Sequence, residues 1–315
     1  MDPSNYLITN FSNMFSRNNW KYAATYEINK MIKSLKTKIS YGYDEIPIII
    51  LKLSASFIIS PLTYICNKSL SSVVFPERLK CVIIKSVYKK GDKLFTANYR
   101  PVSLLTSFSE IFIKLIYSRL YKHVCTNNIL VKEQYGFRIN GFTEAASYDV
   151  INETLKAMNN RLSVGGISCD LEKAFDCVNH GILVDKLQFY WIKGKSLALI
   201  QYYLRARYRR VRIDKFNAYN DVSSGWRKIT NGVPQDSILG PLLFLIYMND
   251  LCMATDSDSK LLFYHQLDAQ TSCLFTYNTL IKILYMFRAY PAHLQEVHVV
   301  ITWTSWRWAG YARNI

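Results

Sequence analysis

The chain has 315 residues, of which 50% are hydrophobic and 14% aromatic. This composition excludes wholesale disorder, and the length is enough for one large or two modest hydrophobic cores. A formal net charge of +16 and a pI near 9.4 favour a phosphate-rich partner through counterion release, and we place nucleic acid ahead of an anionic membrane surface.

Cysteine usage and hydropathy indicate an intracellular protein that does not enter the membrane. The seven cysteines are odd in number and contain no Cys-x-x-Cys pair, so neither a zinc module nor a disulfide framework is indicated. We therefore expect a reducing compartment, the cytoplasm or the nucleus. No signal sequence opens the chain at Met1, and the longest apolar stretch, residues 46–66, is interrupted by Pro47, Lys52 and Pro61, which favours packing inside a fold over crossing a bilayer.

Residue patterns predict helices and strands in the first half of the chain. Residues 22–39 are basic and carry apolar residues near one face, which predicts a helix. Residues 81–88 have the character of a strand, and a basic turn follows them. Ser107 and Glu110 have the spacing of a capping box before an apolar stripe that ends at Leu120. We therefore expect a helix whose start is capped by Ser107 and Glu110.

The second half of the chain alternates between helical and strand patterns. We expect a helix over residues 143–159 and a short strand over residues 164–171 that carries Asp170 at its end. We expect Ser237 to cap a long apolar helix. The intervening elements are predicted as helices near 182–192 and 197–205 and a strand hairpin over 208–229.

Asp170 is the strongest chemical candidate, within Ser-Cys-Asp-Leu-Glu-Lys-Ala-Phe-Asp-Cys-Val-Asn-His. A carboxylate at a strand end is held rigidly and can ligate a hard cation such as Mg²⁺, while leaving coordination positions open for triphosphate oxygens. Taken alone, an aspartate at this place is more often a turn or cap residue.

Two polar turns carry residues that could contact phosphate or bases. Lys89 lies in a basic turn, and Arg100 lies in the segment that follows it. Such cations can neutralise the charge that builds in phosphoryl transfer, although a solvated basic turn is the alternative. Tyr135 and Arg138 lie in the turn Glu-Gln-Tyr-Gly-Phe-Arg. They could stack on a base and contact a phosphate, or could equally anchor the loop.

Arginines are concentrated near residue 208. In an extended segment Arg205, Arg207 and Arg209 share one face, whereas Arg210 and Arg212 share the other. Part of this charge must be ordinary solvent-facing charge. Arg207 and Arg209 are candidates for holding the backbone of a primer or template.

Residues 232–251 restrict the possible functions of the chain more than any other stretch. They read Gly-Val-Pro-Gln-Asp-Ser-Ile-Leu-Gly-Pro-Leu-Leu-Phe-Leu-Ile-Tyr-Met-Asn-Asp-Leu. A tight polar turn runs without a linker into a long apolar helix. Gln235 and the backbone groups of the turn would therefore be presented to a ligand by a rigid, buried element.

These blocks, in this order, closely resemble the reverse transcriptases of non-LTR (LINE-like, jockey-type) retrotransposons. The resemblance covers residues 43–251 and implies an α+β fold with the fingers and a partial palm of a right-hand polymerase. It implies copying of an RNA template into DNA from a DNA primer and dNTPs. Tyr135 and Arg138 fall on the template-contacting turn of the family. Asp176 and His180 match the family pattern too, and we expect them to support the loop, with Asp176 a weaker ligand candidate.

The resemblance also implies roles in nucleotide binding. It places Asp170 on the catalytic, metal-binding aspartate and Phe175 on the bulky residue that screens the 2′ position of the nucleotide. It places Lys89 and Arg100 on the cations that grip the incoming triphosphate, and Gln235 in the turn that contacts the nucleotide.

The chain departs from the family pattern at two places. Asp236 stands where the family has glycine, and an added anion there would weaken nucleotide binding; the alternative is that Asp236 only N-caps the following helix. His265, Gln266 and Leu267 stand where the family has Ala-Asp-Asp. Mg²⁺ is the cofactor that the resemblance implies, but the missing carboxylates count against its binding in this chain.

The resulting hypothesis divides the chain into three parts: a basic N-terminal helical segment (1–40), reverse transcriptase fingers and palm (41–264) and an unrelated tail (265–315). We expect the family's thumb to be missing, and we expect no room before residue 40 for an endonuclease. We expect a reverse transcriptase domain that is catalytically inactive. Two alternatives are a non-catalytic nucleic-acid-binding remnant and an unstable translation product without function.

Overall fold

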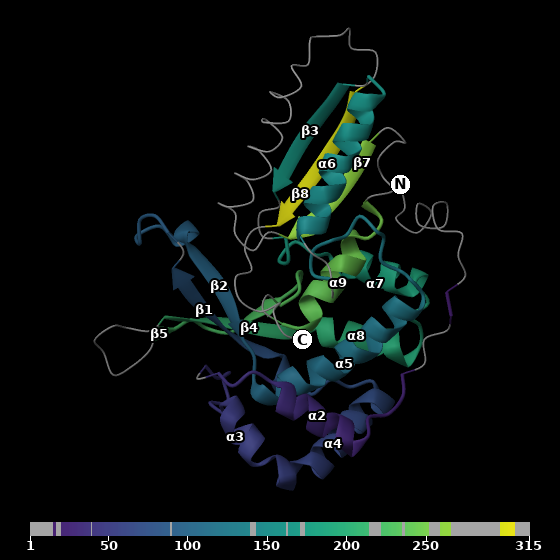
Figure 1. Cartoon of the computed structure of the whole chain (residues 1–315). Coiled ribbons are helices and arrows are strands. Elements are labelled where there is room, and N and C mark those ends of the chain that lie inside the picture. The colour runs from purple at the N-terminus through teal and green to yellow at the C-terminus, as the bar shows by residue number, and fades with distance from the viewer. Residues whose placement is uncertain are drawn as a thin grey trace. The chain divides into compact units, whose positions relative to one another are not determined.

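The computed structural model of the chain forms two compact units (Figure 1). Unit 1 comprises residues 1–129 and 175–247, and unit 2 comprises residues 130–174 and 248–315. The structure describes residues 15–16, 20–38, 40–88, 90–138, 143–161, 163–170, 174–213, 222–234, 237–251, 259–265 and 297–305. In the last two of these segments and in 163–170 it describes the course of the backbone.

Unit 1 contains a five-stranded sheet. Its strands are β1 (Cys81–Tyr88), β2 (Tyr99–Leu104), β4 (Arg207–Ile213), β5 (Val222–Ser223) and β6 (Arg227–Ile229). The order is β2-β1-β4-β5, and β6 also pairs with β4. β1 runs antiparallel to β2 and parallel to β4. The basic hairpin of residues 88–99 therefore lies at the end of a paired β1–β2 ladder.

Unit 1 also contains helices. They are α2 (Thr25–Ser34), α3 (Ile48–Leu53), α4 (Ala55–Ser72), α5 (Ser107–Thr126), α7 (His180–Phe189), α8 (Lys195–Leu204) and α9 (Leu239–Met248). Phe75 is fully buried and packs edge-on against Phe112 of α5 at 5.9 Å and Tyr203 of α8 at 5.2 Å between ring centroids. Aromatic contacts of this geometry join segments that are distant in sequence into one core.

The start of α5 corrects the expected capping box. Thr106, not Ser107, is the N-cap, and its side-chain oxygen accepts a hydrogen bond from the Ser109 N–H at 3.1 Å. The Ser107 hydroxyl instead donates to the carbonyl of Ile46 at 2.7 Å. Glu110 pairs with Lys38 at 3.5 Å, and burial raises the pKa of the Glu110 carboxyl. Ser107 and Glu110 therefore fix the segments before α5 rather than cap the helix.

The apolar stretch 46–66 forms α3 and most of α4, with Pro61 inside α4. Among the helices in the described part of the chain, none has both the length and the apolar character needed to cross a bilayer.

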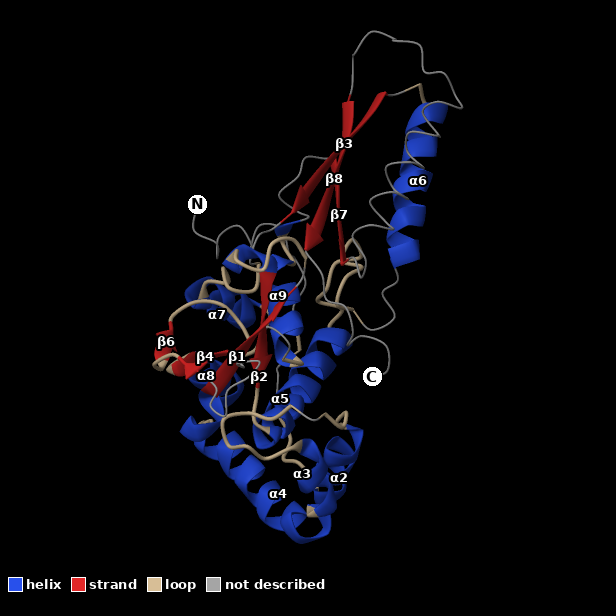
Figure 2. Ribbon diagram, turned by 90° about the vertical axis from the view of Figure 1, so that its left-hand side faces the viewer, coloured by secondary structure: helices blue, strands red, loops and turns tan. Residues whose placement is uncertain are grey.

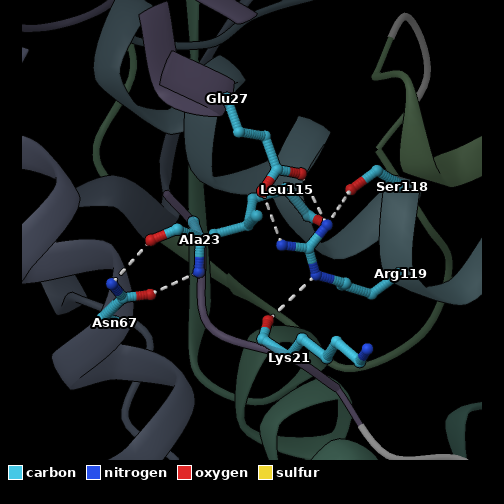
Figure 3. Close-up of polar contacts among 7 residues, drawn as sticks. All are labelled: Lys21, Ala23, Glu27, Asn67, Leu115, Ser118 and Arg119. Atoms are coloured by element: carbon cyan, nitrogen blue, oxygen red, sulfur yellow. Dashed lines mark hydrogen bonds and ion pairs between the residues drawn. The ribbon is translucent and has the colours of Figure 1, made fainter. Parts of the chain in front are cut away.

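Side chains from α4 and α5 hold the segment that enters α2 (Figure 3). Arg119 of α5 makes a bidentate contact with Glu27 of α2, with Nη1–Oε1 and Nη2–Oε2 distances of 2.6 and 2.8 Å. Arg119 Nε also donates to the Lys21 carbonyl at 3.1 Å. Asn67 of α4 accepts from the Ala23 N–H at 2.7 Å and donates to the Ala23 carbonyl at 2.9 Å. A bidentate arginine–carboxylate pair fixes both distance and orientation, so it sets the position of α2.

This pair predicts an acid-sensitive contribution to stability. The hydrogen bond from Arg119 lowers the pKa of Glu27 from its ordinary 4.5. Because the folded-state pKa is the lower one, the contribution is present above about pH 4.5 and is lost as the pH falls through the folded-state value. We expect Glu27→Gln to lower the unfolding free energy at pH 7 by on the order of 1–2 kcal/mol, and by progressively less below pH 4.5.

Urea denaturation at stepped pH values measures this effect. In an Arg119→Met background the Glu27→Gln change should lose its pH dependence. An unchanged pH dependence in that background would show that Arg119 is not its source.

Unit 2 contains a helix and a three-stranded parallel sheet. The helix is α6 (Thr143–Asn159), and the strands are β3 (Ser163–Asp170), β7 (Ser259–His265) and β8 (Val297–Ser305). The order is β3-β8-β7, and both outer strands run parallel to β8. Figures 1 and 2 show α6 lying along one face of this sheet.

Candidate nucleotide and nucleic-acid site

Two segments far apart in sequence are joined in unit 1 by three hydrogen bonds. The Gly232 N–H donates to the Val178 carbonyl at 2.8 Å, and the Val233 N–H donates to the Phe175 carbonyl at 2.9 Å. Nε2 of His180 lies 2.7 Å from the Gly232 carbonyl oxygen. A carbonyl oxygen only accepts, so His180 Nε2 carries the hydrogen. The loop of residues 175–178 and the start of the 232–237 turn are therefore in direct contact.

The contact needs glycine at position 232. Gly232 has φ +86°, and a Cβ atom there would lie 2.8 Å from Asp176 Cα and 2.9 Å from the carbonyl oxygens of Phe175 and Asp176. A side chain would therefore meet backbone that cannot rotate away. The family-like turn thus begins at a position where only glycine fits.

The other end of the same turn is fixed on α9. The Ser237 hydroxyl donates to the Pro234 carbonyl at 2.9 Å and accepts from the Gly240 N–H at 2.9 Å. This confirms the expectation that Ser237 satisfies a backbone N–H at the start of the apolar helix. Leu239, Leu243 and Ile246 of α9 are fully buried, so the turn is connected to a rigid element.

Phe175 and Asp176 make further contacts within the joined segments. The Phe175 ring lies 4.9 Å from the ring of Phe244 on α9, centroid to centroid. Asp176 Oδ1 lies 3.6 Å from Nη1 of Arg209, and the two side chains are 38% and 50% exposed. An ion pair this exposed contributes little to stability, but it places Arg209 beside the loop.

The chain matches the family model described as "Reverse transcriptase (RNA-dependent DNA polymerase)" over residues 87–277. It belongs to the reverse transcriptase family. The match begins at Val87, near the end of β1, and includes β2, the 175–180 loop, the 232–237 turn and β7, so it contains the joined segments described above.

Curated relatives include RNA-directed DNA polymerases, two of them named as probable, from transposons and a mobile element of Drosophila melanogaster. The chain is 31% identical over 260 residues, 82% of its length, to the probable RNA-directed DNA polymerase from transposon BS. It is 29% identical over 226 residues to that from transposon X-element and 30% identical over 226 residues to that of mobile element jockey, 71% of its length in each case. It spans about a quarter of the length of these relatives, 27%, 24% and 24% respectively. The chain is thus a reverse transcriptase domain homologous to those of non-LTR retrotransposons.

The hairpin between β1 and β2, which is predicted to bind the triphosphate, belongs to unit 1. Tyr88 pairs with Tyr99 at the end of β1 and β2, and their rings lie 5.7 Å apart. Arg100 lies on β2 opposite Val87, whereas Lys89 lies outside the described residues. Arg100 is thus next to the hairpin end, and triphosphate binding by Lys89 and Arg100 stays a prediction.

Tyr135 and Arg138, the predicted template contacts, lie in unit 2 and make contacts within the chain. The Tyr135 hydroxyl donates to Asp149 of α6, and burial together with this carboxylate raises the pKa of Tyr135. Arg138 Nη1 donates to the Val131 carbonyl at 3.3 Å, and Arg138 remains exposed. These contacts fit a loop anchor, the alternative reading of this turn, and template binding stays a prediction.

Asp170 is the last residue of β3, which confirms its expected place at a strand end. Phe175 is half-buried in unit 1, whereas Gln235 and Asp236 lie outside the described residues. The structure therefore assigns Asp170 to unit 2 and the Phe175 and Gly232 segments to unit 1.

Reverse transcriptases generally use divalent metal ions, so the neighbours of Asp170 in its sheet test whether such a centre fits. The register of the sheet aligns Asp170 of β3 with Thr304 of β8, and Thr304 with Tyr264 of β7. The next pair is His265 with Ser305. In these described strands the positions level with or just beyond Asp170 supply no carboxylate. Asp170 is thus the one carboxylate at this level of the described strands, which does not fit a two-ion centre that needs carboxylates from two elements.

In the part of the chain that the structure describes, no three His, Cys, Asp or Glu side chains are grouped so that they could hold a metal ion.

Arg207 corrects the expected surface position of the arginine strip. Its side chain is 1% exposed and its guanidinium carbon lies 4.6 Å from the centroid of the Tyr203 ring. Lys80, also 1% exposed, is at the preceding position in the β1–β4 register, and burial lowers its pKa, to which Arg207 contributes. Arg207 therefore cannot contact a nucleic-acid backbone from this buried position. Arg209 is half-exposed, and its contact with a nucleic-acid backbone stays a prediction.

Sequence reasoning missed the bond between His180 and Gly232. Its one signal was the match of His180 to the family pattern, which indicated support for the loop but not a partner. The cap of α7 was also missed: the Asn179 side chain accepts from the N–H groups of Gly181 and Ile182 at 2.8 and 3.2 Å. An Asn followed by a helical pattern is the usual signal for such a cap.

Proposed function

We propose that this reverse transcriptase domain consists of the fingers and a partial palm of a right-hand polymerase whose ancestral reaction is RNA-directed DNA synthesis. In that reaction the 3′-hydroxyl of a DNA primer attacks the α-phosphorus of a dNTP selected by an RNA template, and pyrophosphate leaves. The observation that carries the proposal is the direct hydrogen bonding of the Phe175 loop to the Gly232 turn. It joins the residue proposed to screen the sugar to the turn proposed to contact the nucleotide.

We further propose that this chain does not catalyse the reaction and works inside the cell, in the cytoplasm or nucleus. The support for inactivity is the set of residues beside Asp170, where Tyr264 and His265 end β7 and Gln266 and Leu267 follow in the sequence. A single aspartate cannot complete a two-metal centre. Mg²⁺ is the cofactor expected for the family. Because this chain lacks the second carboxylate, we propose no step that uses Mg²⁺.

A second candidate, a nucleic-acid-binding domain without catalysis, is favoured by the net charge of +16 and by the half-exposed Arg209. The affinity for an RNA–DNA hybrid should then fall steeply as salt increases. Protein binding releases counterions from the nucleic acid, and this release is less favourable at higher salt. Both candidates involve the same ligand and no catalysis by this chain. Retained binding of the hybrid is what the second candidate adds.

Primer extension on an RNA template with Mg²⁺ tests the proposal. We expect wild-type protein and Asp170→Ala to give the same product as a sample without enzyme, while a full-length jockey-type enzyme extends the primer in parallel. Fluorescence anisotropy of the hybrid in the same samples should fall with increasing salt. Metal-dependent extension that Asp170→Ala abolishes would overturn the claim of inactivity, and a flat salt response would overturn the claim of binding.

A further inference from the structure

His180 occupies a fixed position at the first turn of α7. Asn179 caps this helix, and Leu183 and Leu187 on α7 are fully buried. The backbone at His180 is therefore held by the core of unit 1, and its ring is directed from a rigid element at the Gly232 carbonyl, 2.7 Å away. A side chain mounted in this way can transmit the position of α7 to the turn.

The bond from His180 differs from the two backbone bonds beside it. Gly232 and Val233 donate their N–H groups to carbonyls of the 175–178 loop, so those bonds form whatever side chains are present. The Gly232 carbonyl, in contrast, receives its hydrogen bond from the His180 ring. Since this carbonyl belongs to the peptide that links Gly232 to Val233, His180 fixes the plane of the peptide that leads toward Gln235.

We propose that His180 is a positioning residue for nucleotide binding. It orients the 232–237 turn, and through this turn it sets the affinity for a deoxynucleoside triphosphate. The inference rests on the proposed function of the turn. It requires no contact between His180 and the nucleotide, because both ends of the turn are fixed. One end is held by His180 and the 175–178 loop, and the other by Ser237, which accepts a hydrogen bond from Gly240 of α9.

Two substitutions separate the hydrogen bond from the shape of the ring. His180→Phe keeps a flat ring of similar size but has no donor. His180→Gln carries an amide N–H at about the reach of Nε2. His123→Phe is a matched control, because His123 Nε2 also lies 2.7 Å from a backbone carbonyl, that of Tyr190, in the same unit and is buried.

Amide hydrogen exchange on the full chain gives the first measurement. In His180→Phe the exchange rates of the Gly232 and Val233 amides should rise by up to about tenfold relative to other amides, as expected for the loss of one hydrogen bond. His180→Gln should restore most of the protection. His123→Phe should leave the relative protection of these amides unchanged.

Titration with dTTP on a preformed RNA–DNA hybrid, followed by fluorescence, gives the second measurement. The dissociation constant should rise about tenfold in His180→Phe and recover in His180→Gln. Faster exchange at Gly232 and Val233 with unchanged dTTP affinity would overturn the positioning role, and so would unchanged exchange in His180→Phe. If the wild-type chain binds no dTTP, the proposed function of the turn fails, while the exchange measurement still decides whether His180 holds it.

Discussion

Gly232→Ala is expected to lower the free energy of unfolding by about 3–5 kcal/mol, the sum of a left-handed backbone penalty of about 1–2 kcal/mol and two or three disrupted hydrogen bonds of about 1 kcal/mol each. The added Cβ would lie 2.8 Å from Asp176 Cα, so the turn must move away from the 175–178 loop. That movement breaks the bonds from Gly232 and Val233. Urea denaturation monitored by tryptophan fluorescence measures the change.

Other glycines of unit 1 provide matched controls for this effect. Gly194 also has a positive φ, +61°, but a Cβ there meets nothing within 4 Å. Gly225 has open space and no positive φ. Gly194 has ψ −136° together with its positive φ, a backbone conformation that is largely restricted to glycine. Gly194→Ala should therefore lose only this backbone penalty, about 1–3 kcal/mol, and Gly225→Ala should change little. Equal losses at Gly194 and Gly232 would show that the 175–178 loop does not press against the turn.

Arg207→Met is expected to raise the free energy of unfolding by about 1–4 kcal/mol, because it replaces a buried charge with an apolar side chain of similar length. Nε, Nη1 and Nη2 of Arg207 are buried and have no hydrogen-bond partner in the structure as described. Lys80 places a second buried cation nearby. The contact with the Tyr203 ring at 4.6 Å offsets only part of the desolvation penalty, since such contacts are worth about 0.5–2 kcal/mol.

Arg209→Met is the control for this substitution. Arg209 lies two positions along the same strand, is 50% exposed and pairs with Asp176 at 3.6 Å, so its replacement should change stability by less than about 1 kcal/mol. Thermal melting of both variants in matched buffers makes the comparison. A clear loss of stability in Arg207→Met would mean that an anion or carboxylate neutralises Arg207 in solution.

Local patterns predicted several elements closely. The strand Cys81–Tyr88 and the helix Thr143–Asn159 have the expected bounds, and the strand ending near Asp170 differs by one residue at each end. These elements are long or bounded by turn residues, and side-chain periodicity reports directly on such elements. The helix expected over residues 22–39 is shorter, because α2 ends at Ser34.

The errors concern contacts between distant segments. Ser107 has the sequence context of a cap, yet its hydroxyl is used by the Ile46 carbonyl, 61 residues away. Arg207 and Arg209 both have the sequence context of surface charge, yet only Arg209 is at the surface. Arg207 and Arg209 point to the same side of the strand, so strand periodicity does not distinguish them. How far along that side the core extends depends on tertiary packing, and burial of one arginine in a basic strip could therefore not be predicted.

The sequence motifs of the candidate site could be predicted, but the contacts between them could not. The family resemblance identified Phe175 and the turn that begins at Gly232, and these segments do meet in unit 1. The atoms that join them are backbone groups and one imidazole nitrogen, which carry no pattern of their own in the sequence. The carboxylate Asp170 was placed correctly at the end of a strand, while its neighbours Thr304 and Tyr264 depend on strand pairing that a local pattern does not specify.

The contacts that hold α2 determine which sequence changes before Glu27 the fold can tolerate. Arg119 and Asn67 bind the main chain at Lys21 and Ala23 rather than the side chains of these residues. These hydrogen bonds therefore constrain the number of residues between position 21 and Glu27, not the identity of the residue at position 21. Substitutions at Lys21 would leave this anchor intact, whereas insertion or deletion of one residue before Glu27 would shift the bonded carbonyl out of reach of Arg119.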